Sequence, residues 1–317
     1  MNKQKKVWRK ENKIAITVAL IPLIGFTIFH AFPIILSFIG LFCNIDLYDL
    51  TSIKWNNFEG FKSVFIPGHA FDLFYFDLSK YFYKSIIITL WVGSTQLITL
   101  LIALFIATLL RENRPGTKVF QALFFLPSVC STVAIALMFR WMLEWDGGII
   151  NTIFGLDTKW LEDPKTMTWC IIFATIWQAP AYGIVMYKAA FSNINSALYE
   201  AAAVDGANAW HKFRYITLPG IRPTTFFLLQ SGVTAGFLSY DLAKLIINDS
   251  WGVPGGSESM GLTLVRLILY LIGNATTTDA NGNSYMVSCA CVISWLLFIV
   301  TGVLCSIMFR LREKSVE

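Results

Sequence analysis

Two apolar stretches of the sequence, 167–190 and 224–247, carry polar and aromatic side chains that could hold a solute. Gln178 and Tyr182 are four residues apart in the first stretch, so they would share one face of a helix. The candidates in the second stretch are Thr234, Phe237, Tyr240 and Asp241. Rings stack on the apolar face of a sugar, while amides and carboxylates bond its hydroxyls, and polar groups inside a membrane span are functional candidates. The alternative is that Gln178, Tyr182 and Thr234 only bond neighbouring helices, which is common in membranes.

The segment 188–222, which separates these two stretches, is a second candidate site. Asn195 or Ser196 can cap a short helix, Asp205-Gly206 favours a turn, and a second helix would follow until Pro219 ends it. Apolar positions at helical spacing are Leu198, Ala201, Ala202, Phe213 and Ile216. Such an apolar stripe is expected to be buried against another surface. It could pack beneath the chain's own helices or insert into a groove on a partner protein, and the pattern alone favours neither.

The elements that would position both candidate sites are membrane-spanning helices. The chain is 56% hydrophobic and 14% charged, with a mean hydropathy of +0.59, whereas soluble domains have about a quarter charged residues. A span needs roughly 20 apolar residues. Six segments qualify: 15–38, 86–109, 120–143, 167–190, 224–247 and 286–309. The sequence therefore predicts an all-α integral membrane protein with six transmembrane helices, as one domain over residues 1–317.

A further apolar segment, 261–272, is too short to span a bilayer and carries Arg266. We expect it to form an amphipathic helix at the outer surface.

The distribution of positive charge predicts the orientation, because Lys and Arg mark the cytoplasmic side. With the N-terminus inside, the inner segments are 1–13, 111–118, 188–222 and 310–317. They hold 16 of the 25 Lys and Arg residues and 6 of the 20 Asp and Glu residues, so their net charge is +10, against −5 elsewhere. Both termini are then cytoplasmic. No basic run is interleaved with aromatic residues, which argues against nucleic acid as a partner.

The segment 188–222 also carries a longer pattern. Glu200-Ala201-Ala202 is followed by Gly206 and then by Ile216-x-Leu218-Pro219. At every fixed spacing this resembles the EAA motif of permease subunits of ATP-binding-cassette (ABC) importers. The flanking residues, LYEAAAVDGA at 198–207 and FRYITLPGIRPT at 213–224, are similar to the carbohydrate branch of that family. Further matching residues are Pro22, Phe32-Pro33, Phe125-Leu126-Pro127, Arg140-Trp141, Gly148, Asn151, Trp177 and Tyr240-Asp241.

The resemblance covers nearly the whole chain and implies the type I ABC-importer permease fold. Its core would occupy about 82–310, and residues 1–81 would hold the N-terminal tail, the first span and an outer loop. The segment 188–222 would form coupling helices that dock into a cytoplasmic ATPase. Glu200 would pair with a basic residue there, and Gly206 would allow the turn. The implied coupling residues are Glu200, Ala201, Ala202, Asp205, Gly206, Ile216, Leu218 and Pro219.

The resemblance also implies a substrate pathway. Counted back from Glu200, Gln178, Ala179 and Tyr182 fall where a maltose-type permease lines its substrate pocket. Thr234, Ala235 and Leu238 do likewise when counted forward from Pro219. The implied substrate is a carbohydrate, with an oligosaccharide as the expected size. The full candidate pathway is Gln178, Ala179, Tyr182, Thr234, Ala235, Phe237, Leu238, Tyr240 and Asp241.

Energy for transport must come from another polypeptide on this interpretation. A P-loop needs a Gly-Lys pair followed by Ser or Thr, and the sequence contains no Gly-Lys pair. The chain is therefore expected to be a transport subunit and not an enzyme, with no cofactor or metal site of its own, and with ATP and Mg²⁺ bound by the ATPase. The implied partners are a second homologous permease, two cytoplasmic ATPases and an extracytoplasmic solute-binding protein. The expected location is the bacterial cytoplasmic membrane, with several passes through the lipid bilayer.

Other functions remain open from the residues alone. One is an ABC permease for glycerol phosphate or a polyamine, although an anionic substrate would favour several basic residues in the pathway. Another is a secondary carrier driven by ions, for which Asp241 is the plausible mid-membrane carboxylate. A membrane enzyme is disfavoured, because no cluster of His, Asp and Glu has the required spacing.

Overall fold

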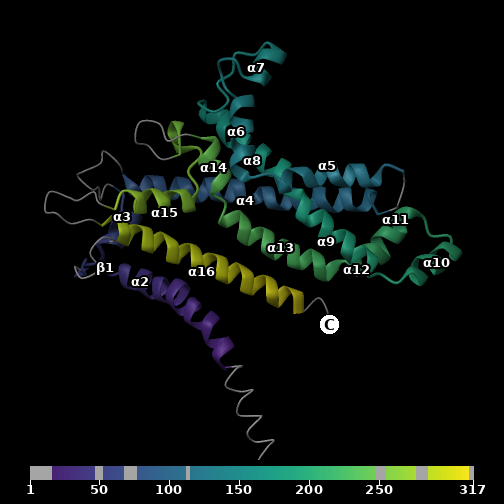
Figure 1. Ribbon diagram of the computed structural model, residues 1–317, viewed down its shortest axis with the longest axis horizontal. Helices are drawn as coiled ribbons and strands as arrows, with labels where there is room; N and C mark the ends of the chain where they lie inside the picture. Colours follow the sequence, from purple (N-terminus) through teal and green to yellow (C-terminus); the bar gives the residue numbers. More distant parts are fainter. Residues whose placement is uncertain are drawn as a thin grey trace, which may run out of the picture. The chain divides into compact units, whose positions relative to one another are not determined.

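The computed structural model describes residues 16–46, 53–67, 77–111, 115–247, 255–275 and 285–313, which are mostly helical (Figure 1). Two compact units are present. One comprises Met1–Phe76 with Leu271–Trp295, and the other comprises Asp77–Tyr270 with Leu296–Glu317. The helix α16 (Met286–Glu313) contributes to both units.

The first described helix of the first unit is Ile16–Gly40, whose 25 residues are long and apolar enough to cross a membrane. It includes one π-helical turn, η1 (Thr27–Ala31), and ends as α2 (Phe32–Gly40). The strands β1 (Cys43–Asn44) and β2 (Lys54–Trp55) then pair antiparallel, and α3 (Glu59–Phe65) follows.

Contacts within this unit join α2 and α3 to the first half of α16. The Trp295 ring packs edge-on against Phe38 at 5.3 Å between centroids, and its Nε1 donates to Ser37 Oγ at 3.2 Å. Asn56 Nδ2 donates to Ser288 Oγ at 2.6 Å, and both residues are buried. Since an unbonded buried amide would be costly, this bond fixes the loop before α3 to α16.

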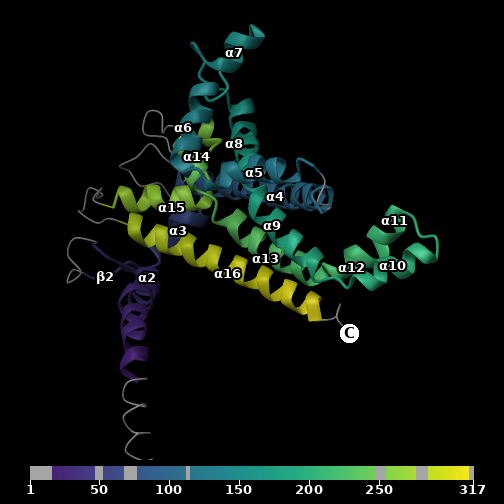
Figure 2. The same cartoon turned by 45° about the vertical axis from the view of Figure 1, so that its right-hand side comes forward.

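The second unit is organised around α4 (Leu78–Leu109), which packs against α8, α9 and α13. Its other elements are α5 (Thr117–Val129), α6 (Thr132–Met142), α7 (Ile149–Phe154), α8 (Pro164–Gln178), α9 (Pro180–Ser192), α10 (Ser196–Val204), α11 (Ala209–Lys212), η2 (Phe213–Thr217), α12 (Leu218–Gly220), α13 (Arg222–Phe237), α14 (Asp241–Ile246), η3 (Ser257–Ser259) and most of α15 (Leu264–Gly273). Figure 2 shows α4 close to α9 and α13, which it contacts.

Two apolar cores lie along α4. Near its start, Ile88 and Val92 pack with Phe139 of α6 and with buried residues of α8 and α14. Near its end, Ala103 and Ala107 pack with Tyr187 of α9 and with Leu228 of α13. The long helix therefore holds the two groups of helices in place.

Most of the predicted spans are present as helices. Within the described residues, four helices are long and apolar enough to cross a bilayer: Ile16–Gly40, Leu78–Leu109, Pro164–Ser192 and Met286–Leu311. The pair Thr117–Val129 and Thr132–Met142 passes the same test together, with a bend of 96° between them. A sixth crossing and the cytoplasmic location of both termini stay predictions. Residues 1–15, 112–114 and 314–317 of the predicted inner segments and first span lie outside the described residues.

Two predicted spans are not continuous helices. The segment 120–143 bends because Cys130 and Ser131 adopt extended backbone, and Pro127 just before them lacks the N–H of a helical turn. The segment 224–247 divides into α13 and α14 around Tyr240, whose φ of −145° and ψ of −48° leave the helical region. α14 packs against α6 and α8 and buries Leu242, Ala243 and Ile246 there, so tertiary packing redirects the chain.

The helix predicted in 261–272 is present as α15, whereas its location at the outer surface stays a prediction. Arg266 is 3% exposed and does not form a polar surface. Its guanidinium donates to the carbonyl oxygens of Ala243 at 2.8 Å, Ile247 at 2.7 Å and Gly261 at 3.2 Å. Carbonyls at a helix C-terminus lack partners within the helix, and Arg266 donates to that of Ile247 at the end of α14. It also adds a second donor to the Ala243 carbonyl, which accepts from the Ile247 N–H as well.

Candidate functional site

The segment 195–220, here called the motif hairpin, begins with a capped helix and a tight turn. Asn195 Oδ1 accepts from the backbone N–H of Ala197 at 3.0 Å and so caps α10. The helix ends in a Schellman motif. The Gly206 N–H bonds the Ala203 carbonyl at 3.1 Å, and the Ala207 N–H bonds the Ala202 carbonyl at 2.8 Å. Gly206 has φ +73°, a value that a residue with a side chain adopts only at a cost.

The second half of the motif hairpin is also built from local chemistry. Asn208 Oδ1 accepts from the backbone N–H of His211 at 2.8 Å and caps α11. The π-helical η2 and the short α12 continue the chain, so the two predicted helices and the turn between them are present. Ile216 and Leu218 are half-buried, and Pro219 is exposed at the end of the hairpin.

One side of the motif hairpin is open in the single chain. Glu200, Ala201 and Asp205 are exposed, and Ala202 is half-buried. Four large apolar residues are also exposed: Leu198 at 53%, Val204 at 89%, Trp210 at 66% and Tyr215 at 71%. The helices that the structure describes therefore do not cover this surface. Of the two alternatives that the sequence left open, this favours docking to a partner protein.

The base of the motif hairpin is fixed to the end of α4. The Arg111 guanidinium lies over the Tyr199 ring at 4.1 Å from its centroid and 5.7 Å from that of Phe191. The Tyr199 hydroxyl bonds Thr217 Oγ1 at 2.8 Å, and Arg111 Nη1 donates to the same oxygen at 3.4 Å. Thr217 is 2% exposed, so its hydroxyl lies at the buried end of this contact, while Arg111 is exposed. Because Arg111 and Thr217 are 106 residues apart in sequence, no local pattern could have identified this anchor.

The predicted pathway residues border two hollows in the second unit. The Tyr182 hollow, of about 210 Å³, lies between α4, α9 and α13, and Ala179, Tyr182 and Ala235 line it. The Thr234 hollow, of about 490 Å³, lies between α13 and the end of α16, and Thr234, Ala235 and Leu238 line it. Ala235 lines both hollows, so α13 separates two openings.

The remaining pathway candidates lie outside the linings of these hollows. Gln178 Nε2 lies 3.5 Å from Thr132 Oγ1 at the start of α6, which matches the alternative of a contact between helices. Phe237 is the last residue of α13, and Tyr240 and Asp241 follow where the chain turns into α14. Lys244 Nζ lies 5.5 Å from the centroid of the Tyr240 ring, and Asp241 is exposed.

Sequence reasoning missed several polar residues of the hollows. Gln96 and Thr99 of α4 line the Tyr182 hollow, Gln230 lines the Thr234 hollow, and Ser231 lines both. The sequence did carry one signal of a close contact between helices at this position, because Gly232 and Gly236 are spaced four apart in an apolar segment.

A close approach of two glycines brings α4 and α13 together. A Cβ built on Gly236 would lie 2.9 Å from the Gly93 Cα, so a side chain at this crossing would separate the helices. The same crossing brings Gln96 of α4 close to α13, because that Cβ would lie 3.2 Å from the Gln96 Cγ. The glycines thus set the distance between the helices that line the Tyr182 hollow.

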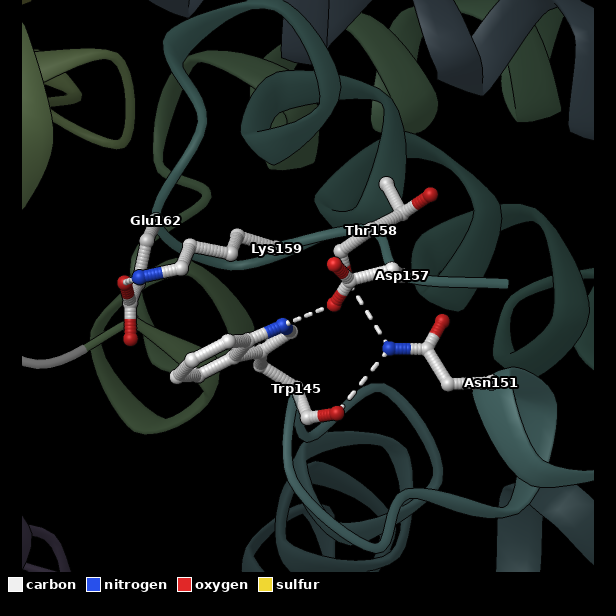
Figure 3. A network of polar contacts seen from close by, with 6 residues as sticks. All are labelled: Trp145, Asn151, Asp157, Thr158, Lys159 and Glu162. Carbon is white, nitrogen blue, oxygen red and sulfur yellow. Dashed lines mark hydrogen bonds and ion pairs between the residues drawn. The ribbon is translucent and has the colours of Figure 1, made fainter. Parts of the chain in front are cut away.

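The loop between α6 and α8 is folded around Asn151, which is 6% exposed (Figure 3). Asn151 Nδ2 donates to the carbonyls of Trp145 at 3.1 Å and Thr158 at 2.9 Å, and its Oδ1 accepts from Trp160 Nε1 at 2.7 Å. Lys159 Nζ lies 4.0 Å from the Trp145 ring centroid. A glycine is required at 148, because a Cβ there would collide with the Glu144 carbonyl. The resemblance had identified Gly148 and Asn151, and the contacts give a structural reason for both.

Comparison with known proteins identifies the family. The model of the binding-protein-dependent transport system inner membrane component matches residues 99–313, which include the motif hairpin and the helices α9 and α13. The chain belongs to this family. It is therefore an inner-membrane permease of ABC type, and the expected family and membrane location are confirmed.

Curated relatives of the permease include sugar-transport proteins. It is 29% identical over 315 residues to the probable ABC transporter permease protein YesP of Bacillus subtilis (strain 168), covering 98% of this chain and 93% of that protein. It is 31% identical over 227 residues to the lactose transport system permease protein LacF of Rhizobium radiobacter, covering 69% of this chain and 72% of that protein. The arabinooligosaccharides transport system permease protein AraP of Bacillus subtilis (strain 168) is 26% identical over 247 residues, covering 76% of this chain and 73% of that protein.

A solved structure shares the fold of the permease. A chain in the crystal structure of a bacterial ABC transporter involved in the import of the acidic polysaccharide alginate matches with a TM-score of 0.77. The identity is 22%, and the match covers 98% of this chain and 100% of that chain. This confirms the ABC-permease fold that the motif predicted.

Proposed function

We propose that the permease moves a carbohydrate, an oligosaccharide by size, across the cytoplasmic membrane by alternating access coupled to ATP hydrolysis on a separate subunit. The observation that carries the proposal is the motif hairpin. It presents Glu200 beside exposed apolar side chains, while its base is anchored to α4 through Arg111. A rigid base with an uncovered apolar and acidic surface is suited to transmit the movement of a docked protein.

The docked protein would be a cytoplasmic ATPase. Glu200 would pair with a basic residue on its surface, Gly206 would permit the turn, and Leu218 and Pro219 would fix the exit toward α13. Ala201, Ala202, Asp205 and Ile216 complete the proposed contact. Two such ATPases, which bind ATP and Mg²⁺, a second permease and an extracytoplasmic solute-binding protein would complete the importer.

A neutral sugar fits the hollows better than an anion does. Their linings include the amides of Gln96 and Gln230, the hydroxyls of Ser231 and Tyr182, and aromatic rings. Among the described residues, no Lys, Arg, Asp or Glu lines either hollow. The relatives whose printed names include lactose and arabinooligosaccharides support the same substrate class.

The coupling role is tested by Glu200→Lys in vesicles that contain the complete importer. We expect the variant to assemble but to lose ATP-dependent uptake by about 30-fold or more, since truncating one partner of a buried charge pair costs about 2–5 kcal/mol. The matched control is Glu162→Lys, which reverses an exposed carboxylate outside the motif hairpin. Uptake at the wild-type rate in Glu200→Lys would refute the coupling role.

The substrate class is tested in the same vesicles by competition. Neutral oligosaccharides should compete for uptake, whereas glycerol phosphate and polyamines should not. Uptake that persists without the ATPase and follows a proton or sodium gradient would replace the proposal with an ion-coupled carrier.

A further inference from the structure

A third hollow, of about 310 Å³, lies between residues 84–91 of α4 and 164–172 of α8 and is here called the Trp91 hollow. Trp91 and Trp169 line it with their rings edge-on, at 5.6 Å between centroids. Two lysines, Lys84 and Lys165, line it as well. None of its lining residues borders the Tyr182 or Thr234 hollow, so it is separate from the proposed pathway.

The Trp91 hollow carries positive charge without an internal counter-charge. Among the described residues, neither Lys84 nor Lys165 forms an ion pair, and no carboxylate lines the hollow. The nearby carboxylate of Asp163 accepts instead from the backbone N–H of Lys165, at 2.9 Å, as the N-cap of α8. Two lysines beside one cavity repel each other, so an anion between them would be favoured.

The surface that continues from the Trp91 hollow along α4 is apolar. Trp91, Ile98, Leu101 and Phe105 lie on one face of the helix and are 45% to 67% exposed. The ten helical steps from Trp91 to Leu101 cover about 15 Å at 1.5 Å per step. This is half of the ~30 Å hydrocarbon core, and therefore the depth of one lipid leaflet.

We propose that the Trp91 hollow is a binding site for an anionic phospholipid. The headgroup phosphate lies between Lys84 and Lys165, and an acyl chain runs along the apolar face of α4. The position of the two tryptophans agrees with this, because Trp favours the depth of the headgroups at a membrane surface. A water-soluble anion would use the lysines but not the apolar face, and a protein partner would not need the uncompensated charge.

The experiment uses the full-length permease in lipid nanodiscs that contain brominated lipids, which quench nearby tryptophan fluorescence. Brominated phosphatidylglycerol is compared with brominated phosphatidylcholine at the same mole fraction. We expect phosphatidylglycerol to be preferred by about 30-fold at this site, or about fivefold for each lysine. Lys84→Gln/Lys165→Gln should abolish the preference, Lys84→Arg/Lys165→Arg should keep it, and Trp91→Phe/Trp169→Phe should remove the lipid-specific quenching.

The matched control is Lys54→Gln/Lys118→Gln, which removes the same charge at two exposed positions and should keep the preference. Thermal unfolding of each variant confirms that it is folded. Equal quenching by the two lipids in the wild type would overturn the proposal, as would displacement of the lipid by millimolar inorganic phosphate. Protection of both tryptophans from either lipid, with cross-links from the hollow to another subunit, would assign the site to a protein contact and also overturn it.

Discussion

Thr217→Val, at the anchor of the motif hairpin, should make the hairpin open more easily. Valine has the shape of threonine, so the substitution removes a hydroxyl from a site that is 2% exposed without leaving a cavity. The Tyr199 hydroxyl then loses its 2.8 Å bond, and Arg111 loses a longer contact of 3.4 Å. The cation–π contact of Arg111 with the Tyr199 ring, at 4.1 Å, is unchanged.

The expected cost follows from these contacts. A fully buried hydroxyl left without its partner costs about 1–3 kcal/mol, and Tyr199 is only half-buried. The long contact to Arg111 adds little. The hairpin should therefore open more easily by about 1–2 kcal/mol. Because opening governs amide exchange, this corresponds to about 5- to 30-fold faster exchange in α10. In a double-mutant cycle with Tyr199→Phe, the two effects should not add, because each substitution breaks the same bond.

The assay is hydrogen–deuterium exchange of the full-length permease, followed on peptides that cover 196–220. The control is Ser192→Ala, which removes a hydroxyl that bonds only the Ala189 carbonyl of its own helix at 2.7 Å. Wild-type exchange in Thr217→Val would refute the anchor. So would fully additive effects in the cycle with Tyr199→Phe, because the two side chains would then act independently.

Three further substitutions test separate parts of the structure. Gly206→Ala should lower the stability of the turn by about 1–2 kcal/mol through backbone strain at φ +73° alone, because a Cβ there meets nothing within 4 Å. Gly206→Asn should lower it less, and amide exchange measures both effects. Asn151→Ala should destabilise the loop between α6 and α8 by about 2–3 kcal/mol, since three partners lose hydrogen bonds, and near-UV circular dichroism of the loop tryptophans should change. Arg266→Met should lower the free energy of unfolding by about 3 kcal/mol, because it removes the donors to the carbonyls of Ala243 and Ile247 at the end of α14. The unfolding temperature should fall accordingly. Unaltered exchange, an unaltered dichroism spectrum or an unaltered unfolding temperature, respectively, would contradict these expectations.

The sequence alone determined the features that depend on neighbouring residues. Asn195 and Gly206 identified the capped helix and the turn of the motif hairpin, because a cap and a positive φ are set by side chains within a few positions of the backbone they serve. The apolar segments located most of the membrane helices for a similar reason, since a span is defined by length and composition. The EAA spacing identified the family.

Tertiary structure decided how these pieces meet. The division of 224–247 around Tyr240 and the burial of Arg266 depend on packing among α6, α8, α14 and α15, which no local window contains. Arg111 contacts Thr217 of the motif hairpin, although the two residues are 106 apart in sequence. Lys84 and Lys165, from different helices, line one cavity. Contacts of this kind are specified by the packing of whole helices, whose mutual positions depend on small residues such as Gly93 and Gly236 at their crossing.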